Sequence, residues 1–200
     1  TARICVLSGA GMSADSGVPT FRDTGAWDQR DADRFASLRA WQERPEEVWA
    51  WHWQLARLVR GCEPHAGHHA LARWAARARL TVATQNIDDL HERAGSADPI
   101  HLHGRLLEFA CSECDTPVEL DVPPLTVADA QRPTRLDPPV CASCGGDVRP
   151  MVTWFGEHLP PGAFDEALDA MLEADLLLVV GTSAIVQPAG SLPHIARGHG

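Results

Sequence analysis

The sequence predicts an α/β fold: a parallel sheet with helices on both faces, joined to a small zinc-binding lobe and a helical insertion. Three apolar runs, at residues 3–7, 80–84 and 176–180, have the length of buried strands, and each ends in small or polar residues. Such strands are typical of a Rossmann-like parallel sheet, whose ligands bind at the carboxyl ends of the strands. Two C-x2-C pairs between the second and third runs predict the zinc lobe.

The composition fits one globular domain with a small inserted module. The 200 residues are 44% hydrophobic and 22% charged, which excludes a disordered or fibrous chain. No apolar run approaches the roughly 20 residues that a membrane helix needs. The first residues lack the long apolar region of a secretory signal, so we expect a cytoplasmic protein with no membrane partner.

The charge balance is acidic, with 17 basic and 27 acidic residues and a net charge of -10. This balance argues against a general nucleic-acid binder, which would carry a basic patch or stripe. Every basic residue other than histidine is an arginine. The sequence therefore contains no lysine side chain that could itself be modified.

The first apolar run leads into a glycine-rich segment at residues 9–14, GAGMSA. This segment fits a loose G-x-G-x-x-A turn, in which glycines let backbone N–H groups approach a pyrophosphate at a helix N-terminus. Gly17 and Pro19 would break that helix within two turns. The loop that follows presents Phe21 and Arg22, an aromatic ring and a guanidinium that suit a lid over a dinucleotide.

Helices are expected at residues 45–60 and 68–79, and a third at about 164–172 leads into the last strand. The tryptophans of the first two helices are interpreted as core residues: Trp49, Trp51, Trp53 and Trp74. A proline-rich loop at 121–139 is expected to be exposed and mobile. We expect a Rossmann-like domain at residues 1–30, 78–108 and 148–200, a helical module at 31–77 and a zinc lobe at 109–147.

The two cysteine pairs are Cys111 with Cys114 and Cys141 with Cys144, separated by 26 residues. Four thiolates suit tetrahedral Zn²⁺, and a site without an open ligand position is structural. A pair of redox-active C-x2-C motifs is the alternative interpretation. Gly145 and Gly146 favour zinc, because a tight turn after the second pair needs unhindered backbone.

Taken together, these motifs resemble the sirtuins, NAD-dependent protein-lysine deacylases. The matching segments are residues 9–13, 19–22, 84–88, 101–104, the two cysteine pairs, 152–157 and 181–183, in the family's order. The resemblance covers nearly the whole chain. It implies NAD and zinc as cofactors and acyl-lysine proteins as substrates.

The resemblance also implies a reaction in which NAD is consumed. The acyl-lysine oxygen attacks the ribose carbon that bears nicotinamide, and the acyl group finally leaves on ADP-ribose. His103 would be the general base that deprotonates a ribose hydroxyl, a role that suits the ordinary pKa of histidine. Asn86 would be the second catalytic residue.

The binding residues follow from the same resemblance. Cofactor contacts are implied for Gly9, Ala10, Gly11, Ser13, Thr20, Phe21, Arg22, Gln85, Asn86, Ile87, Asp88, Gly181, Thr182 and Ser183. Substrate contacts are implied for His52, Leu55, Val152, Trp154, Phe155, Gly156 and Glu157, where residues 152–157 would accept the substrate peptide as an added strand. His65, His68 and His69 are interpreted as surface or capping residues.

One departure from the family concerns the acyl group. Family members that remove succinyl and malonyl groups carry a Tyr-x-x-Arg pair on a helix that Glu-Pro-Asn-Ala-Gly-His follows. Ungapped counting places His52 and Leu55 at those two positions. Because the guanidinium that would clamp an acyl carboxylate is missing, we expect neutral acyl groups, acetyl or somewhat longer, to be preferred.

A second departure is that the family pattern continues past Gly200 with another strand and an Asn-x-Glu segment that would hold the adenosine. Three other functions stay open at this point. The first is mono-ADP-ribosyl transfer to protein. The second is a non-catalytic NAD-binding module, and the third is a hydride-transferring enzyme, which the loop at Phe21 and Arg22 disfavours.

Overall fold

The computed structural model describes residues 2–20, 34–125 and 134–199, which fall into two compact units. The described residues of the first unit are 2–20, 63–104 and 158–199. Those of the second are 34–62, 105–125 and 134–157. Phe21 and Arg22 lie outside the described residues.

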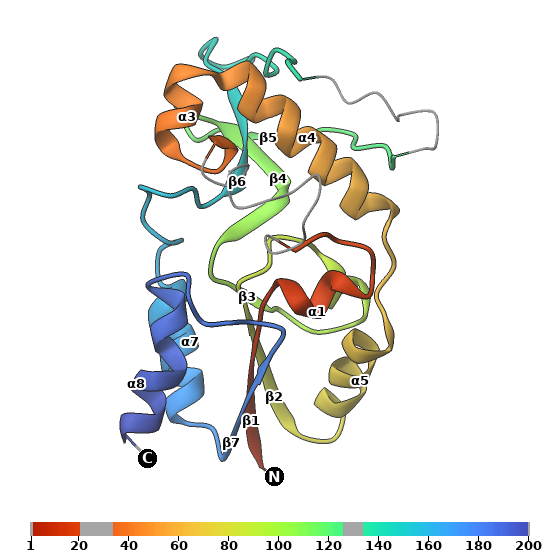
Figure 1. Ribbon diagram of the computed structural model, residues 1–200, viewed down its shortest axis with the longest axis vertical. Helices are drawn as coiled ribbons and strands as arrows, with labels where there is room; N and C mark the ends of the chain where they lie inside the picture. The colour runs from red at the N-terminus through yellow and green to blue at the C-terminus, as the bar shows by residue number, and fades with distance from the viewer. Residues whose placement is uncertain (1, 21–33, 126–133, 200) are drawn as a thin grey trace. The chain divides into compact units, whose positions relative to one another are not determined.

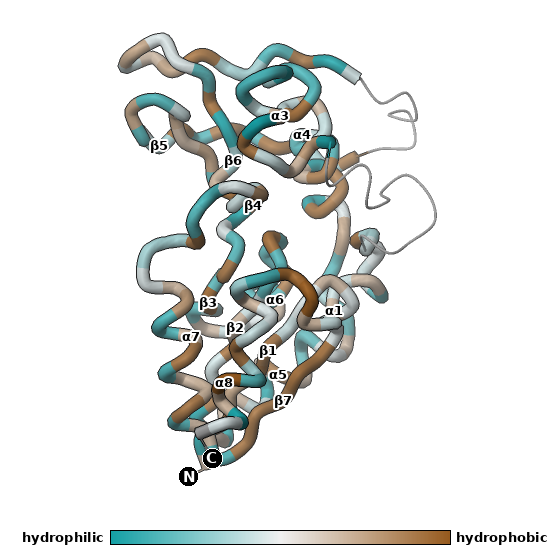
Figure 2. Tube along the Cα trace, turned by 60° about the vertical axis from the view of Figure 1, so that its left-hand side comes forward, coloured by the Kyte–Doolittle hydropathy of each residue, from teal (hydrophilic) through white to brown (hydrophobic). Residues whose placement is uncertain are grey.

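The first unit is built on a four-stranded sheet with the order β3-β2-β1-β7. Its strands are β1 (Arg3–Ser8), β2 (Arg79–Thr84), β3 (Ile100–His101) and β7 (Leu176–Val180). All neighbouring strands pair in parallel, and β1 lies between β2 and β7. The parallel sheet and its three apolar strands are therefore confirmed, and β3 is added to them. Hydrophobic residues run along β7 in Figure 2.

Helices cover both faces of this sheet (Figure 1). The helical elements are α1 (Ala10–Ala14), α5 (Ala66–Ala75), α6 (Leu90–Arg93), α7 (Ala163–Leu172), η2 (Ala189–Ser191) and α8 (Leu192–His199). α7 and α8 lie on one side of the strands and α5 on the other. The core between the sheet and the α7 side comprises Cys5, Leu7, Ala83, Ile100, Leu102, Ala163, Ala167, Met171, Ala189 and Leu192.

The second unit combines helices with a small sheet of order β5-β4-β6. Its elements are α3 (Leu38–Glu43), α4 (Pro45–Gly61), β5 (Pro117–Val118) and β6 (Val148–Val152), together with β4 (Gly104–Cys111), which begins at the last residue of the first unit. Trp49 of α4 packs edge-on against Phe109 of β4, with ring centroids 5.8 Å apart. This contact places α4 in the same unit as the cysteine pairs.

The two observed units differ from the three ranges expected from the sequence. The helix expected at 68–79 is α5, which ends at Ala75 because β2 begins at Arg79 and which belongs to the first unit. Of the four tryptophans expected in the core, Trp49 is buried, and Trp51, Trp53 and Trp74 are half-buried. The three-part division stays a prediction.

Most described residues of the proline-rich loop at 121–139 are exposed, as expected, and its described parts are hydrogen-bonded to α4. Leu125 N–H donates to the Arg57 carbonyl at 3.0 Å, and Leu136 N–H donates to the Glu46 carbonyl at 3.0 Å. Val122 is buried. Across the parts of the chain that the structure describes, no helix has both the length and the apolar character to cross a bilayer.

Replacing Leu7 by alanine tests the central position of β1. Leu7 is fully buried, so the Leu7→Ala variant should lose about 2–5 kcal/mol of unfolding free energy, measured by denaturant titration. Leu172→Ala removes the same atoms from a side chain that is 42% exposed and should cost much less. Equal losses in the two variants would contradict the assignment of Leu7 to the core.

Candidate functional site

The loop after β1 lies directly against the turn after β7. Gly9 N–H donates to the Val180 carbonyl at 3.1 Å, and Gly11 N–H donates to the Gly181 carbonyl at 2.8 Å. A Cβ on Gly9 would lie 2.5 Å from the Thr182 Cβ, so only glycine permits this approach. These two amides therefore join the loop after β1 to the turn after β7.

Ser13 links the loop after β1 to the loop after β2. Its hydroxyl donates to Asp88 Oδ2 at 2.8 Å and accepts from Asn86 Nδ2 at 3.0 Å. Leu90 N–H donates to the other carboxylate oxygen of Asp88 at 3.1 Å. All three polar side chains are buried. Burial raises the pKa of Asp88, and the hydrogen bonds from Ser13 and Leu90 oppose that shift.

Gln85 joins the ends of β2 and β7. The Thr182 hydroxyl donates to Gln85 Oε1 at 2.6 Å and accepts from Ala184 N–H at 3.1 Å. Gln85 Nε2 is buried and has no hydrogen-bond partner within the described part of the chain. An amide group held by its oxygen in this way has its two N–H donors left for a ligand.

His103 follows β3 and is held by one ring nitrogen. Because the partner of Nδ1 is the Gln85 carbonyl, at 3.0 Å, Nδ1 carries the proton and donates. The other nitrogen, Nε2, is buried and unpartnered among the residues that the structure describes. Burial lowers the pKa of His103, which favours the neutral ring. The structure therefore presents an imidazole lone pair that can accept a proton.

These groups fit a polar ligand such as NAD. The segments after β2 and β3 provide a donor at Gln85 and an acceptor at His103 that have no partner among the described residues. A ribose hydroxyl can both accept from an amide and donate to an imidazole. Of the other expected cofactor residues, Ile87 is half-buried between Asn86 and Asp88, and Ser183 is exposed in the turn after β7. The individual cofactor contacts stay predictions.

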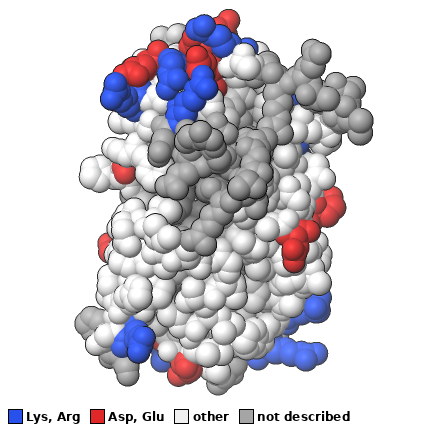
Figure 3. Space-filling model, viewed as in Figure 1, with Lys and Arg blue, Asp and Glu red and all other residues white. Residues whose placement is uncertain are grey.

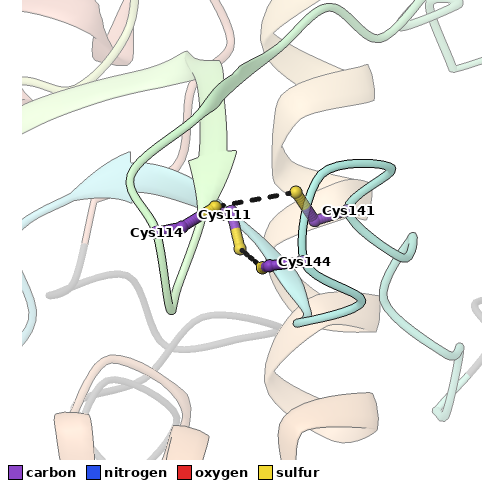
Figure 4. Close-up of side chains that lie close together, drawn as sticks. All are labelled: Cys111, Cys114, Cys141 and Cys144. Atoms are coloured by element: carbon purple, nitrogen blue, oxygen red, sulfur yellow. Dashed lines mark hydrogen bonds between the residues drawn. The ribbon is translucent and has the colours of Figure 1, made fainter.

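The four expected metal ligands cluster in the second unit (Figure 4). The ligand atoms of Cys111, Cys114, Cys141 and Cys144 all lie within 4.8 Å of one another. Two of the sulfur–sulfur distances are 3.4 and 3.8 Å. Tetrahedral zinc with Zn–S bonds of about 2.3 Å needs sulfurs about 3.8 Å apart, so the donor set fits Zn²⁺.

Backbone amides lie close to two of the sulfurs in this cluster. Ser143 N–H lies 3.4 Å from Cys141 Sγ, and Gly146 N–H lies 3.4 Å from Cys144 Sγ. The amide of Ser143 is the largest of the influences that lower the pKa of Cys141. A Cβ on Gly146 would lie 2.6 Å from Glu113 Cγ, so a larger residue there would displace the exposed Glu113 side chain.

His52 and Trp154, two of the expected substrate residues, are bonded to each other. Trp154 Nε1–H donates to His52 Nε2 at 3.0 Å, and His52 Nδ1 donates to the Val48 carbonyl at 2.8 Å. Burial lowers the pKa of His52 to about 4, in agreement with a neutral ring that uses both nitrogens. Leu55 and Val152 are also buried.

The segment around Phe155 is held by hydrogen bonds within its own unit. Phe155 N–H donates to the Ala36 carbonyl at 2.9 Å, and its carbonyl accepts from Leu38 N–H at 3.1 Å. The Phe155 side chain is 53% exposed. Because both backbone groups of Phe155 are paired, an added substrate strand would have to use other residues of 152–157.

Glu157 is fixed by Arg149, a residue that the sequence interpretation missed. Arg149 Nη1 and Nη2 lie 2.6 and 2.9 Å from the two carboxylate oxygens of Glu157. The Arg149 guanidinium also stacks 3.6 Å above the Trp154 ring. No spacing in the sequence signals this contact.

The three histidines of residues 65–69 divide into different roles. His65 caps α5, and His69 is exposed, as expected. The expectation for His68 is wrong, because its side chain is completely buried. Its ring packs against His65 and His91 with centroids 4.4 and 4.9 Å away. No local spacing signals this burial, because His91 lies 23 positions further along the sequence.

The cysteine cluster predicts how the protein responds to loss of a ligand. Cys141→Ser should abolish retention of one zinc ion per chain and lower the melting temperature, because structural zinc contributes folding free energy. Metal analysis and thermal unfolding would measure both effects. Cys62→Ser removes a thiol outside the cluster and should keep the zinc. Full zinc content in Cys141→Ser would contradict the four-thiolate site.

Comparison with known proteins agrees with this arrangement. The model of the Sir2 family matches residues 9–188. An NAD-dependent protein deacylase of Corynebacterium glutamicum is 48% identical over 202 residues, which cover 98% of this chain and 76% of the relative. A protein of the same name from Mycobacterium tuberculosis is 47% identical over 200 residues, 99% of this chain and 82% of the relative.

Solved structures show the same fold. A mutant Sir2 homologue in complex with ADP-ribose superposes with a TM-score of 0.87 at 40% identity, covering 100% of this chain and 78% of that chain. A Sir2 homologue in complex with NAD gives a TM-score of 0.86 at 40% identity, covering 100% and 75%. The chain belongs to the Sir2 family.

Proposed function

We propose that this protein is an NAD-dependent protein deacylase that removes acyl groups from lysine side chains of other proteins. The observation that carries the proposal is His103, whose Nδ1 is held by a backbone carbonyl while its buried Nε2 has no partner in the described part of the chain. The relatives named NAD-dependent protein deacylase support it. Their names do not favour the alternative, ADP-ribose transfer to protein.

In this proposal, the residues that follow β2 and β3 have separate roles in the reaction. NAD supplies the electrophilic ribose carbon and the ADP-ribose that receives the acyl group. His103 accepts the proton of a ribose hydroxyl at Nε2, and the hydrogen bond to Gln85 holds its ring in the required tautomer. Gln85 Nε2 donates to the ribose. Asn86 and Asp88, fixed through Ser13, hold the ribose and the nicotinamide carboxamide.

The remaining expected contacts belong to the same proposal. Gly9, Ala10, Gly11, Gly181 and Thr182 form the close loops that receive the nucleotide. The four cysteines hold a structural zinc ion that takes no part in the reaction. Cysteines that serve as metal ligands and not as disulfides are typical of a reducing compartment, so we place the protein in the cytoplasm.

Charge supports protein substrates over nucleic acid. On the face drawn in Figure 3, arginine and acidic side chains lie side by side. Arg39 pairs with Glu43 at 2.7 Å, and Arg34 pairs with Glu47 at 3.1 Å. Arginines paired in this way contribute little to a continuous basic surface for phosphates.

The acyl group that the protein prefers is neutral. At the two positions where a desuccinylase would carry tyrosine and arginine, His52 is neutral and bonded to Trp154, and Leu55 is apolar. The nearby guanidinium of Arg149 is occupied by Glu157. A carboxylate on the acyl group would lose its hydration here, and neither Leu55 nor the paired Arg149 would replace it.

The direct test of the function is mass spectrometry of an acetyl-lysine peptide incubated with the protein, with and without NAD. Loss of the acetyl group only with NAD, together with acetylated ADP-ribose and nicotinamide, is the expected result. An ADP-ribose adduct on protein, with the peptide still acetylated, would instead establish the transferase.

The role of His103 predicts a pH profile. Burial lowers its pKa below the ordinary 6.5, so the base is lost to protonation only as the pH falls through that lower value. The acid limb of kcat/KM should therefore have its midpoint below 6.5. His103→Ala should lower kcat by roughly 100- to 10,000-fold. An acid limb above pH 7, or a fully active alanine variant, would contradict the role.

The acyl preference predicts that kcat/KM for an acetyl-lysine peptide exceeds that for the succinyl peptide by about 10-fold or more. The double variant His52→Tyr with Leu55→Arg should raise succinyl activity, because it supplies the missing clamp. Leu58→Arg, which adds the same charge one turn along α4, is the matched control. A wild-type protein that prefers the succinyl peptide would overturn the preference.

A further inference from the structure

His65 connects two segments of the first unit that are distant in sequence. Its Nδ1 accepts from Gly67 N–H at 2.8 Å, which caps the N-terminus of α5. Its Nε2 lies 2.5 Å from the carbonyl oxygen of Met12, in α1. Because Nδ1 accepts, Nε2 carries the proton and donates to Met12. One neutral ring therefore joins α5 to α1.

The Met12 carbonyl needs such a donor because α1 is short. In a longer helix this oxygen would accept from the amide of residue 16. Here Ser16 N–H donates to the Ser13 carbonyl at 3.1 Å, and Gly17 N–H donates to the Ala14 carbonyl at 2.9 Å. His65 thus supplies a hydrogen bond to the last turn of α1 that the backbone does not.

The His65 ring is held in place from two sides. Its Cε1 and Nδ1 lie over Gly67, where a Cβ would come within 2.4 Å of His65 Cε1. On another side it packs against the buried ring of His68, with centroids 4.4 Å apart. His68 in turn packs against His91, whose Nε2 lies 2.9 Å from the Ser8 hydroxyl at the end of β1. The ring therefore has little freedom to leave Met12.

We propose that His65 is a positioning residue for the nucleotide loop, residues 9–13. By holding the Met12 carbonyl it fixes α1, and with it the neighbouring Ser13, whose hydroxyl organises Asp88 and Asn86. This inference rests on the proposed function in assigning residues 9–13 to NAD. The hydrogen bond from His65 Nε2 to the Met12 carbonyl, here called the His65 strap, is a property of the fold and does not depend on that assignment.

The type of side chain matters at this position. Residues 63–68 of this chain, EPHAGH, resemble the Glu-Pro-Asn-Ala-Gly-His segment of the family, with His65 at the position of the asparagine. An asparagine can cap α5 through its side-chain oxygen. Asparagine is shorter than histidine and has no donor at the position of His65 Nε2. The His65→Asn variant would therefore keep the cap on α5 and lose the hydrogen bond to the Met12 carbonyl.

The test compares His65→Asn with Ala70→Gly. Ala70 is exposed in the same helix, and glycine there weakens α5 without touching Met12. His65→Asn should raise the KM for NAD roughly 3- to 10-fold, the value of one hydrogen bond, with the KM for the acyl peptide and kcat at saturating NAD unchanged. Ala70→Gly should leave all three at the wild-type values.

Hydrogen exchange separates this inference from the proposed function. Amides of residues 10–17 should exchange faster in His65→Asn than in wild type or Ala70→Gly, whether or not the wild type deacylates a peptide. If the wild type does not deacylate the peptide but the variants show this exchange pattern, the proposed function is wrong and the structural role of His65 is supported. If His65→Asn changes neither the amide exchange of residues 10–17 nor the KM for NAD, the proposed role of His65 is wrong. The role is also wrong if Ala70→Gly changes both quantities as much as His65→Asn does.

Discussion

The parallel pairing of β1 with β2 on one side and β7 on the other is the constraint on which the candidate site depends. In this arrangement the carboxyl ends of the strands lie at one edge of the sheet. The loops that follow residues 8, 84, 101 and 180 therefore meet there. Glycines at positions 9 and 11 let two of these loops touch, since any side chain would collide with the turn after β7. Sequence segments far apart in the chain become one polar surface.

Most polar groups of that surface are used to hold it together. The Ser13 hydroxyl is hydrogen-bonded to both Asn86 and Asp88, and the Thr182 hydroxyl donates to Gln85 Oε1. Two buried nitrogens, Gln85 Nε2 and His103 Nε2, are left without partners within the described residues. Leaving a buried polar atom unpaired costs about 1–3 kcal/mol, so a ligand that pairs with them gains this free energy. Under the proposed function, the fixed groups would position NAD, Gln85 Nε2 would donate to it and His103 Nε2 would accept its proton.

Much of this architecture could be predicted from the sequence. The three strands follow from short apolar runs with polar ends, and the cysteine cluster follows from ligand type and spacing. β3 could not be recognised because it has only two residues, Ile100 and His101, and owes its existence to pairing with β2. The burial of His68 was missed because histidine is polar, and its environment comes from His91, 23 positions along the sequence.

The finer features of the site depend on contacts that no local pattern encodes. The amides of Gly9 and Gly11 donate to the carbonyls of Val180 and Gly181, over 160 residues away, and no local pattern predicts these bonds. His52 was expected to line the acyl site, and its Nε2 accepts a hydrogen bond from Trp154 Nε1–H of the same unit. The sequence motifs thus identify the residue types of the site, and tertiary hydrogen bonds decide which of their atoms are available.

The availability of His103 Nε2 is the central claim, and nitrogen NMR of the histidine rings measures it directly. In ¹⁵N-labelled protein at pH 7, with His103→Ala used to assign the signals, His103 should show a protonated Nδ1 and a bare Nε2. Its titration midpoint should lie below 6.5, because burial lowers its pKa. A ring protonated at Nε2, or charged at pH 7, would contradict the account of this site.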